Sequence, residues 1–327
     1  MKALWLENHT LNFRNDVPEP EPLAGEAMVA VRKAGICATD LELLKGYSPF
    51  RGIPGHEFVG EIIQTSNQMI PVGQRVIGEI NVACGTCNLC LRGYPRHCEW
   101  RTVLGIRNRN GAFAEYLCLP VGNLLPVPDD VSDDAAVFVE PLAAALQIEE
   151  QVDIRPDDRV LVIGAGRLGQ LISQTLTLSG CDLITVARHK KQQKILEIRK
   201  IRWIDEHTIP DRFFDFVVEA TGGPAGFAAA RKAVRPGGTI VLKSTYKGEL
   251  QVDFAALVVD EITIVGSRCG PFAPALRLLP DRRVDPADLI EGFYSLENAS
   301  QAFEKAAQPG SLKVLFDMER IKNDSDN

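Results

Sequence analysis

The chain lacks any run of about 20 apolar residues, which is the length that a helix needs to cross a membrane. Its first residues, MKALWLENHT, contain no apolar stretch of signal-peptide length. An excess of positive charge is also absent, because 36 Lys and Arg residues stand against 43 Asp and Glu residues, for a net charge of -7. A polyanion would therefore meet no attractive field. We expect a cytoplasmic protein that binds neither a membrane nor a nucleic acid.

The composition is that of a folded globular chain. With 327 residues, 45% hydrophobic and 24% charged, the chain is long enough for about two domains. In a reducing compartment, clustered cysteines favour metal binding over disulfide bonds, and four of the eight cysteines are clustered here. The clustered cysteines therefore predict a metal site.

The chain has two parts that differ in their pattern of predicted strands and helices. Short β-like runs separated by turn signals occupy the first part, including residues 27–31, 58–63 and 75–80. From about residue 140, strand-like runs at 160–163, 183–186, 214–218, 239–242 and 262–265 alternate with helical segments. This pattern predicts an α/β protein in which a doubly wound domain, residues 141–269, interrupts a β-rich domain formed by residues 1–140 and 270–327.

A glycine-rich turn, VLVIGAGRLGQ, covers residues 160–170. Its glycines form the G-x-G-x-x-G of a strand-to-helix turn, in which the second glycine lets the backbone approach a pyrophosphate and the helix offers its N-terminal amides. The strand-like run at 183–186 closes a βαβ unit of about 30 residues, which favours dinucleotide binding over a purely structural turn. The residues expected at the phosphate are Gly164, Gly166, Arg167, Leu168 and Gly169.

Four cysteines follow the spacing C-x2-C-x2-C-x7-C, at Cys84, Cys87, Cys90 and Cys98. Four thiolates so close in sequence can close a tetrahedral zinc site that leaves no position open for a substrate. An iron–sulfur cluster is an alternative, but the bacterial ferredoxin run continues with x3-C-P, which is absent here. Free buried cysteines are the other alternative. We predict a structural zinc ion at this lobe.

A second, dispersed set comprises Cys37, His56, Glu57 and Glu140. Singly, each has an ordinary interpretation as a small buried residue, a loop histidine or a solvated carboxylate. Together they offer a thiolate, an imidazole and carboxylates, enough for a zinc ion with three protein ligands and one open position. The charges of Cys37 and Glu140 would offset a divalent ion, and Glu57 could serve as an alternative ligand with a part in catalysis.

In these motifs the chain resembles the zinc-dependent medium-chain dehydrogenases/reductases of the alcohol dehydrogenase superfamily, above all their polyol and threonine dehydrogenase branch. The matching segments are residues 35–40, 55–57, the four-cysteine lobe, residues 140–143, the glycine turn and residues 219–222. The resemblance implies a GroES-like catalytic domain that carries two zinc ions per chain, a Rossmann domain, and a homodimer or homotetramer. Glu140 stands where some branches carry a second catalytic cysteine, so it is expected to be a direct or water-mediated ligand.

The resemblance also implies a reaction and further roles. The zinc ion acts as a Lewis acid on an alcohol oxygen, and a nicotinamide cofactor exchanges hydride with the carbon of the alcohol or carbonyl substrate. Thr39 would take the substrate proton, and Asp40 would support the ligand histidine. Glu42 stands where many relatives carry a histidine that ends the proton relay. Thr221 and Lys313 match cofactor-binding positions, and Lys313 is expected at the phosphate.

The choice of cofactor depends on the end of the second strand of the doubly wound domain. An NAD enzyme usually places an acidic residue there to bind the ribose, whereas this chain has Ala187 and Arg188 followed by His189. Asp182 opens the strand and should point away from the ribose. A basic run could also be a solvated helix start. We predict that Arg188 binds a 2'-phosphate and that NADP is favoured over NAD.

Two other classes of function compete with this hypothesis. A catalytically inactive relative with a structural or binding role would be expected to lose its active-site ligands, whereas Cys37, Thr39, His56 and Glu140 are all present. A zinc-ribbon binding module would use only the four-cysteine lobe, a small part of the chain. The identity of the alcohol does not follow from these motifs.

Overall fold

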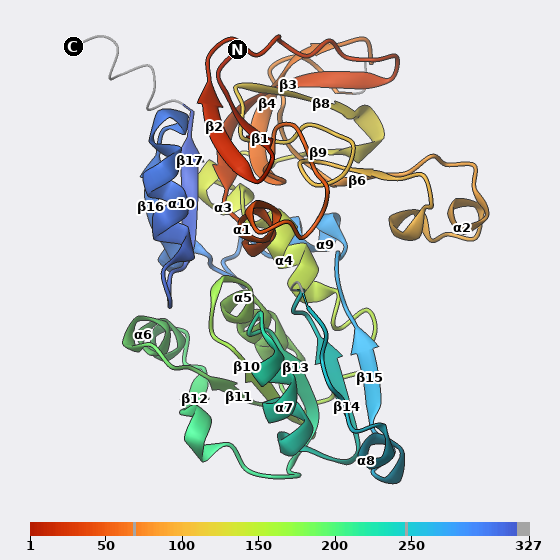
Figure 1. Cartoon of the computed structure of the whole chain (residues 1–327), viewed down its shortest axis with the longest axis vertical. Coiled ribbons are helices and arrows are strands. Elements are labelled where there is room, and N and C mark those ends of the chain that lie inside the picture. The colour runs from red at the N-terminus through yellow and green to blue at the C-terminus, as the bar shows by residue number, and fades with distance from the viewer. Residues whose placement is uncertain (68–69, 246–247, 319–327) are drawn as a thin grey trace. The chain divides into compact units, whose positions relative to one another are not determined.

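The computed structural model describes residues 1–67, 70–245 and 248–318 and divides the chain into two compact units (Figure 1). Unit 1 comprises Met1–Glu140, Phe272–Gln308 and the residues from Lys313 onward. Unit 2 comprises Pro141–Pro271 and Pro309–Leu312. The sequence did not anticipate that the short segment Pro309–Leu312 belongs to unit 2. There Gly310 lies so close to His189 that a Cβ on the glycine would come within 2.7 Å of the ring.

Seven strands form the main sheet of unit 1, in the order β16-β17-β3-β4-β5-β9 with β8 also paired to β3. Their bounds are β3 Glu26–Gly35, β4 Glu57–Thr65, β5 Arg75–Gly78, β8 Tyr116–Pro120, β9 Leu124–Pro126, β16 Ile290–Tyr294 and β17 Lys313–Asp317. Strand β17 is buried along its whole length and pairs antiparallel with β3, so segments far apart in sequence share one sheet. The ring of Phe316 on β17 meets the ring of Phe113 edge to face, with the ring centroids 5.0 Å apart.

Smaller elements surround this sheet. The strands are β1 Ala3–Glu7, β2 Thr10–Arg14, β6 Asn81–Val82 and β7 Thr102–Val103. The helices are α1 Ala38–Leu44, α2 Asn88–Leu91, α3 Asp133–Ala136, α9 Phe272–Arg277 and α10 Ala299–Ala307. Helix α4, Val139–Leu146, begins in unit 1 and continues into unit 2. Helix α1 follows β3 closely and carries Thr39 and Asp40, two of the predicted site residues.

Unit 2 is built on a parallel sheet of six strands in the order β12-β11-β10-β13-β14-β15. The strands are β10 Arg159–Ile163, β11 Asp182–Val186, β12 Arg202–Ile204, β13 Phe214–Glu219, β14 Val234–Leu242 and β15 Thr263–Gly266, and the helices are α5 Arg167–Leu176, α6 Lys190–Ile198, α7 Pro224–Ala233 and α8 Phe254–Val259. Residues 160–163 of strand β10 are all apolar and buried, as expected for a strand that is covered on both faces. This architecture confirms the predicted α/β fold class.

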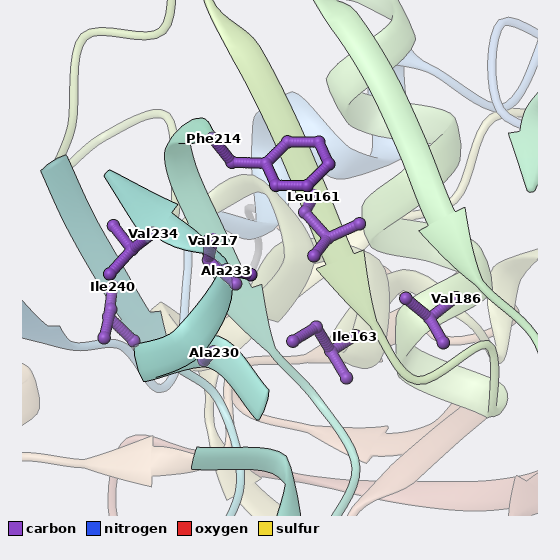
Figure 2. Close-up of a cluster of buried hydrophobic side chains, with 9 residues drawn as sticks. All are labelled: Leu161, Ile163, Val186, Phe214, Val217, Ala230, Ala233, Val234 and Ile240. Atoms are coloured by element: carbon purple, nitrogen blue, oxygen red, sulfur yellow. The ribbon is translucent and has the colours of Figure 1, made fainter. Parts of the chain in front are cut away.

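The core of unit 2 contains nine closely packed apolar residues from the central strands and helix α7 (Figure 2): Leu161, Ile163, Val186, Phe214, Val217, Ala230, Ala233, Val234 and Ile240. Small alanines on α7 let the helix approach the sheet, and Phe214 fills the space at the start of β13. Burial of this kind supplies most of the stability of a doubly wound domain.

The strand order of unit 2 reverses between β10 and β13, because the chain runs outward through β11 and β12 and then returns to the other side of β10. In open α/β sheets, ligands bind at such a switch point, beyond the carboxyl ends of the strands. The fold therefore directs the search for a cofactor site to the residues that follow these strands. Among the described residues, no helix has the length and apolar character that crossing a bilayer requires.

Candidate active site

One cluster of possible metal ligands in unit 1 consists of Cys37, His56 and Glu57, whose ligand atoms lie within 4.8 Å of one another. The antiparallel pairing of β3 with β4 places Gly35 opposite Glu57, so the residue that caps α1 and the residues that begin β4 converge. His56 and Glu57 are buried, and Cys37 is half-buried. Sequence positions about twenty residues apart thus meet at one end of the sheet.

Asp40 lies against two members of this cluster. Its Oδ2 accepts a hydrogen bond from the Cys37 amide at 2.8 Å, and its Oδ1 lies 3.5 Å from His56 Nδ1. Burial lowers the pKa of His56, but the negative charges of Asp40 and Cys37 outweigh it and raise this pKa well above its ordinary value. The negative charges of Asp40 and Cys37 therefore favour a cation at this position.

Only one of the two carboxylate oxygens of Glu57 has a partner among the described residues. Its Oε2 is paired with the ammonium group of Lys313, which also donates to the Ile36 carbonyl at 3.5 Å. Its Oε1 is buried and has no hydrogen-bond partner among the described residues. Lys313 was expected to hold a cofactor phosphate; in the structure its side chain is 2% exposed and is paired with Glu57.

Glu140 lies in the first turn of α4, outside the group whose atoms lie within 4.8 Å. Burial raises its pKa to about 7, with the His56 charge lowering this pKa and the Glu57 charge raising it. A carboxyl group with such a pKa can release its proton at little cost when a cation binds nearby. The structure therefore keeps Glu140 close enough to respond to the cluster electrostatically.

These residues fit a zinc ion. A thiolate, an imidazole and a carboxylate are the ligand types that zinc prefers, and three protein ligands are the number found at catalytic sites. The unpaired Oε1 of Glu57 supports this assignment, because a buried carboxylate oxygen without a partner is costly unless something binds it. The support of His56 by Asp40 is typical of metal-binding histidines.

Thr39 and Glu42 follow on helix α1. The Thr39 Oγ1 lies 3.7 Å from the Cys37 sulfur, so its hydroxyl is adjacent to the metal cluster. Glu42, one turn further, is paired with Lys45 at 2.8 Å. The sequence analysis did not single out Lys45, although its spacing of three residues from Glu42 on a helix is a recognisable signal.

A second cluster is the four-cysteine lobe, formed around α2 and a short helical turn at Pro95–His97. The Cys84–Cys98 and Cys87–Cys90 sulfur pairs are each 3.5 Å apart, and Cys87 and Cys98 are 3.8 Å apart. Backbone amides of Thr86 and Cys87 lower the pKa of Cys84 to about 6. Four sulfurs so close together, with amides that stabilise a thiolate, match a closed tetrahedral zinc site.

We expect Cys87→Ser to destabilise unit 1, because a structural zinc ion contributes directly to folding. A loss of about 3 kcal/mol lowers Tm by roughly 6 to 12 °C in a domain of this size. Calorimetry and zinc content measure the effect, with Cys181→Ser as control, since that half-buried cysteine lies outside both clusters. A Cys87→Ser protein that kept its Tm and its zinc would overturn the structural assignment.

The glycine turn of unit 2 meets the requirements of a pyrophosphate site. Gly164 has φ of +106°, and a Cβ on Gly169 would come within 1.8 Å of the Gly164 carbonyl oxygen, so both positions need glycine. A Cβ on Gly166 would instead meet no atom within 4 Å. Space beside this glycine, together with the backbone amides at the start of α5, where Arg167 and Leu168 lie, is what a phosphate would use.

Two further predicted cofactor residues have partners in unit 2. The amide and hydroxyl of Thr221 both donate to Glu219 Oε1, at 2.8 and 2.6 Å. Arg188, which follows β11, is 59% exposed and pairs with Glu206 at 2.6 Å. The sequence analysis missed Glu206, because the three-residue strand β12 that precedes it was too short to predict.

Comparisons with known proteins agree with this picture. Residues 23–129 match the family of alcohol dehydrogenase GroES-like domains. The chain is 30% identical over 313 residues to D-arabinitol dehydrogenase 1 of Uromyces fabae, covering 88% of this chain and 89% of that protein.

Solved structures extend the similarity to the whole fold. A protein described as a zinc-binding dehydrogenase from Sinorhizobium meliloti 1021, bound to NADP, is 26% identical with a TM-score of 0.89, covering 97% of this chain and 98% of its own. A protein described as a short chain alcohol dehydrogenase from Escherichia coli CFT073, complexed with NADH, is 27% identical with a TM-score of 0.89, covering 97% of this chain and 99% of its own. Together with the two cysteine-containing clusters, these similarities mean that the chain belongs to the zinc-type medium-chain dehydrogenases/reductases.

Proposed function

We propose that this protein interconverts an alcohol and its ketone or aldehyde by exchanging hydride with a nicotinamide cofactor. The observation that carries the proposal is the buried cluster of Cys37, His56 and Glu57 with Asp40 behind it. Secondary alcohols, polyols and amino alcohols are the candidate substrates. The complete set of ligand residues argues against an inactive relative.

The protein's own residues would orient the substrate and move its proton. Cys37 and His56 would hold a zinc ion, with Glu57 or Glu140 as the third ligand, and when bound the ion would lower the pKa of the alcohol. Asp40 keeps His56 in one orientation. The Thr39 hydroxyl, 3.7 Å from the Cys37 sulfur, would accept the substrate proton. Glu42, three residues beyond Thr39 on α1 and paired with Lys45, would pass it toward solvent.

The assay that tests this proposal measures reduction of NAD and NADP at 340 nm with a panel of secondary alcohols, polyols and amino alcohols. The zinc-loaded protein should reduce at least one cofactor with one class of alcohol. If the zinc-loaded protein turned over none of them in either direction, the inactive alternative would replace the proposal.

We propose two zinc ions per chain with different lability. The four-cysteine lobe offers four thiolates and leaves no coordination position open. The cluster of Cys37, His56 and Glu57 offers weaker ligands and leaves one coordination position open. A chelator should therefore remove one ion together with activity before the protein unfolds. Elemental analysis during chelation checks this, and one zinc ion per chain, or iron, in the untreated protein contradicts it.

We propose NADP as the preferred cofactor. The support is the position of Arg188 at the carboxyl end of β11, beside the strand that carries the glycine turn. A guanidinium binds a phosphate through paired, charge-assisted hydrogen bonds. One solved relative was bound to NADP and another to NADH, so the choice between the two cofactors has to be inferred from the residues of this chain.

We propose a cytoplasmic homodimer or homotetramer. Strand β15 lies at one end of the sheet of unit 2, and helix α8 beside it exposes Phe254, Val258 and Val259 by 72%, 75% and 81%. An edge strand next to apolar side chains is suited to pairing with a second copy. Eight free cysteines, four of them gathered for a metal ion, suit a reducing compartment.

A further inference from the structure

Lys243 is a buried lysine in unit 2 that the proposed reaction does not use. It follows β14 directly and is 7% exposed. Its ammonium group donates hydrogen bonds to the Ala144 carbonyl at 2.6 Å, the Arg268 carbonyl at 3.0 Å and the Ser267 hydroxyl at 3.1 Å. Three segments of the chain, from α4, the end of β14 and the end of β15, therefore meet at one nitrogen atom.

Burying an ammonium group costs free energy. It loses its hydration on burial, and it is tolerated only when its three N–H donors find acceptors, as they do here. Apolar residues of similar volume often stabilise a protein at least as well as buried charges. The value of Lys243 must then lie in the arrangement that it imposes, namely fixed positions for the residues after β14 and β15.

Those residues occupy a particular half of the sheet. In a doubly wound sheet each half binds one mononucleotide, and the glycine turn and Arg188 lie on the β10–β11 side. The ends of β13, β14 and β15 therefore face the other half of a dinucleotide, which carries the nicotinamide. The backbone ladder continues past the strands at this edge, with the Lys243 amide donating to the Glu219 carbonyl and the Ser267 amide to the Leu242 carbonyl.

We propose that Lys243 is a positioning residue for the nicotinamide half of the cofactor. By holding Ser267 and Arg268 against the end of β14, it fixes the backbone groups that the nicotinamide ring and its carboxamide would contact. This inference rests on the proposed use of a nicotinamide cofactor. It assigns no contact between the lysine itself and the cofactor.

Direct binding measurements on the full chain test the proposal. Calorimetric titration with NADPH and NADH reports on the whole cofactor. Adenosine 2',5'-bisphosphate reports on the adenosine part alone, and ADP-ribose on everything except the nicotinamide base. For Lys243→Met, Kd for the reduced dinucleotides should rise by about 10-fold, because the backbone groups that face the nicotinamide are no longer held in place, while Kd for the two probes without nicotinamide changes less than about twofold. Ser267→Ala, which removes one of the three acceptors, should give the same pattern with a smaller change.

The matched control is Lys232→Met on helix α7, a lysine that is 68% exposed and paired with Asp211. It should change none of the four affinities. Equal weakening of all four probes by Lys243→Met, or no weakening of any, would show that the lysine is only structural. If Lys243→Met does not fold, Ser267→Ala decides the question by the same criterion. Failure of the wild type to bind either dinucleotide would instead reject the proposed function.

Discussion

We expect Cys37→Ser to lower kcat by about 1000-fold or more for whichever alcohol the protein oxidises, a cost of about 4 kcal/mol in the transition state, because loss of the thiolate would weaken the binding of a zinc ion that would polarise the alcohol oxygen. The fold should survive. Cys37 is the N-cap of α1, and serine is among the best residues at such a position. Turnover, zinc content and Tm measured on one preparation separate loss of the metal from loss of structure.

His56→Ala should match Cys37→Ser in activity, since both remove a ligand of the same cluster. The control is Cys118→Ser, because Cys118 is also a half-buried cysteine of unit 1 but belongs to neither cluster. It should retain full turnover and both metal ions. A Cys37→Ser protein with more than about a tenth of wild-type kcat would show that the cluster is not the catalytic centre.

The sequence predicted the features of the fold that depend on local patterns. The buried strand β10, the glycine turn and helix α5 each have a signature within a few residues, and the structure places them within two residues of the expected positions. The strand predicted at residues 239–242 is part of the longer β14, which begins at Val234. Its Pro-Gly-Gly segment signals a turn in sequence, but β13 pairs with the residues on both sides of it.

The contacts that the sequence did not reveal are those between segments far apart along the chain. Lys313 matched a phosphate-binding position by motif, yet β17 runs antiparallel to β3, and this pairing brings its ammonium to Glu57, 256 residues away. The link from Lys243 to Ala144 spans 99 residues. Such pairings depend on sheet order and register, and neither can be read from the composition of a single segment.

Cofactor choice should be decided by Arg188. A charge-assisted pair with the 2'-phosphate contributes about 1.5 to 3 kcal/mol, so Arg188→Ala should cost roughly 10- to 150-fold in kcat/KM with NADP and leave the value with NAD nearly unchanged. The pair with Glu206 is partly exposed, so it opposes phosphate binding by at most about 1 kcal/mol. Glu206→Gln should accordingly raise kcat/KM with NADP by up to about fivefold.

A matched control exists at the opposite end of the same strands. Arg202, on β12, is 60% exposed and pairs with Asp182 at the start of β11, so Arg202→Ala removes a similar ion pair far from the carboxyl ends of the strands. It should leave both cofactors unaffected. Ala187→Asp combined with Arg188→Leu should reverse the preference, because a carboxylate repels the phosphate and accepts hydrogen bonds from a free ribose. A wild type that prefers NAD, or an Arg188→Ala protein that loses both cofactors equally, would mean that Arg188 is only a solvated residue paired with Glu206.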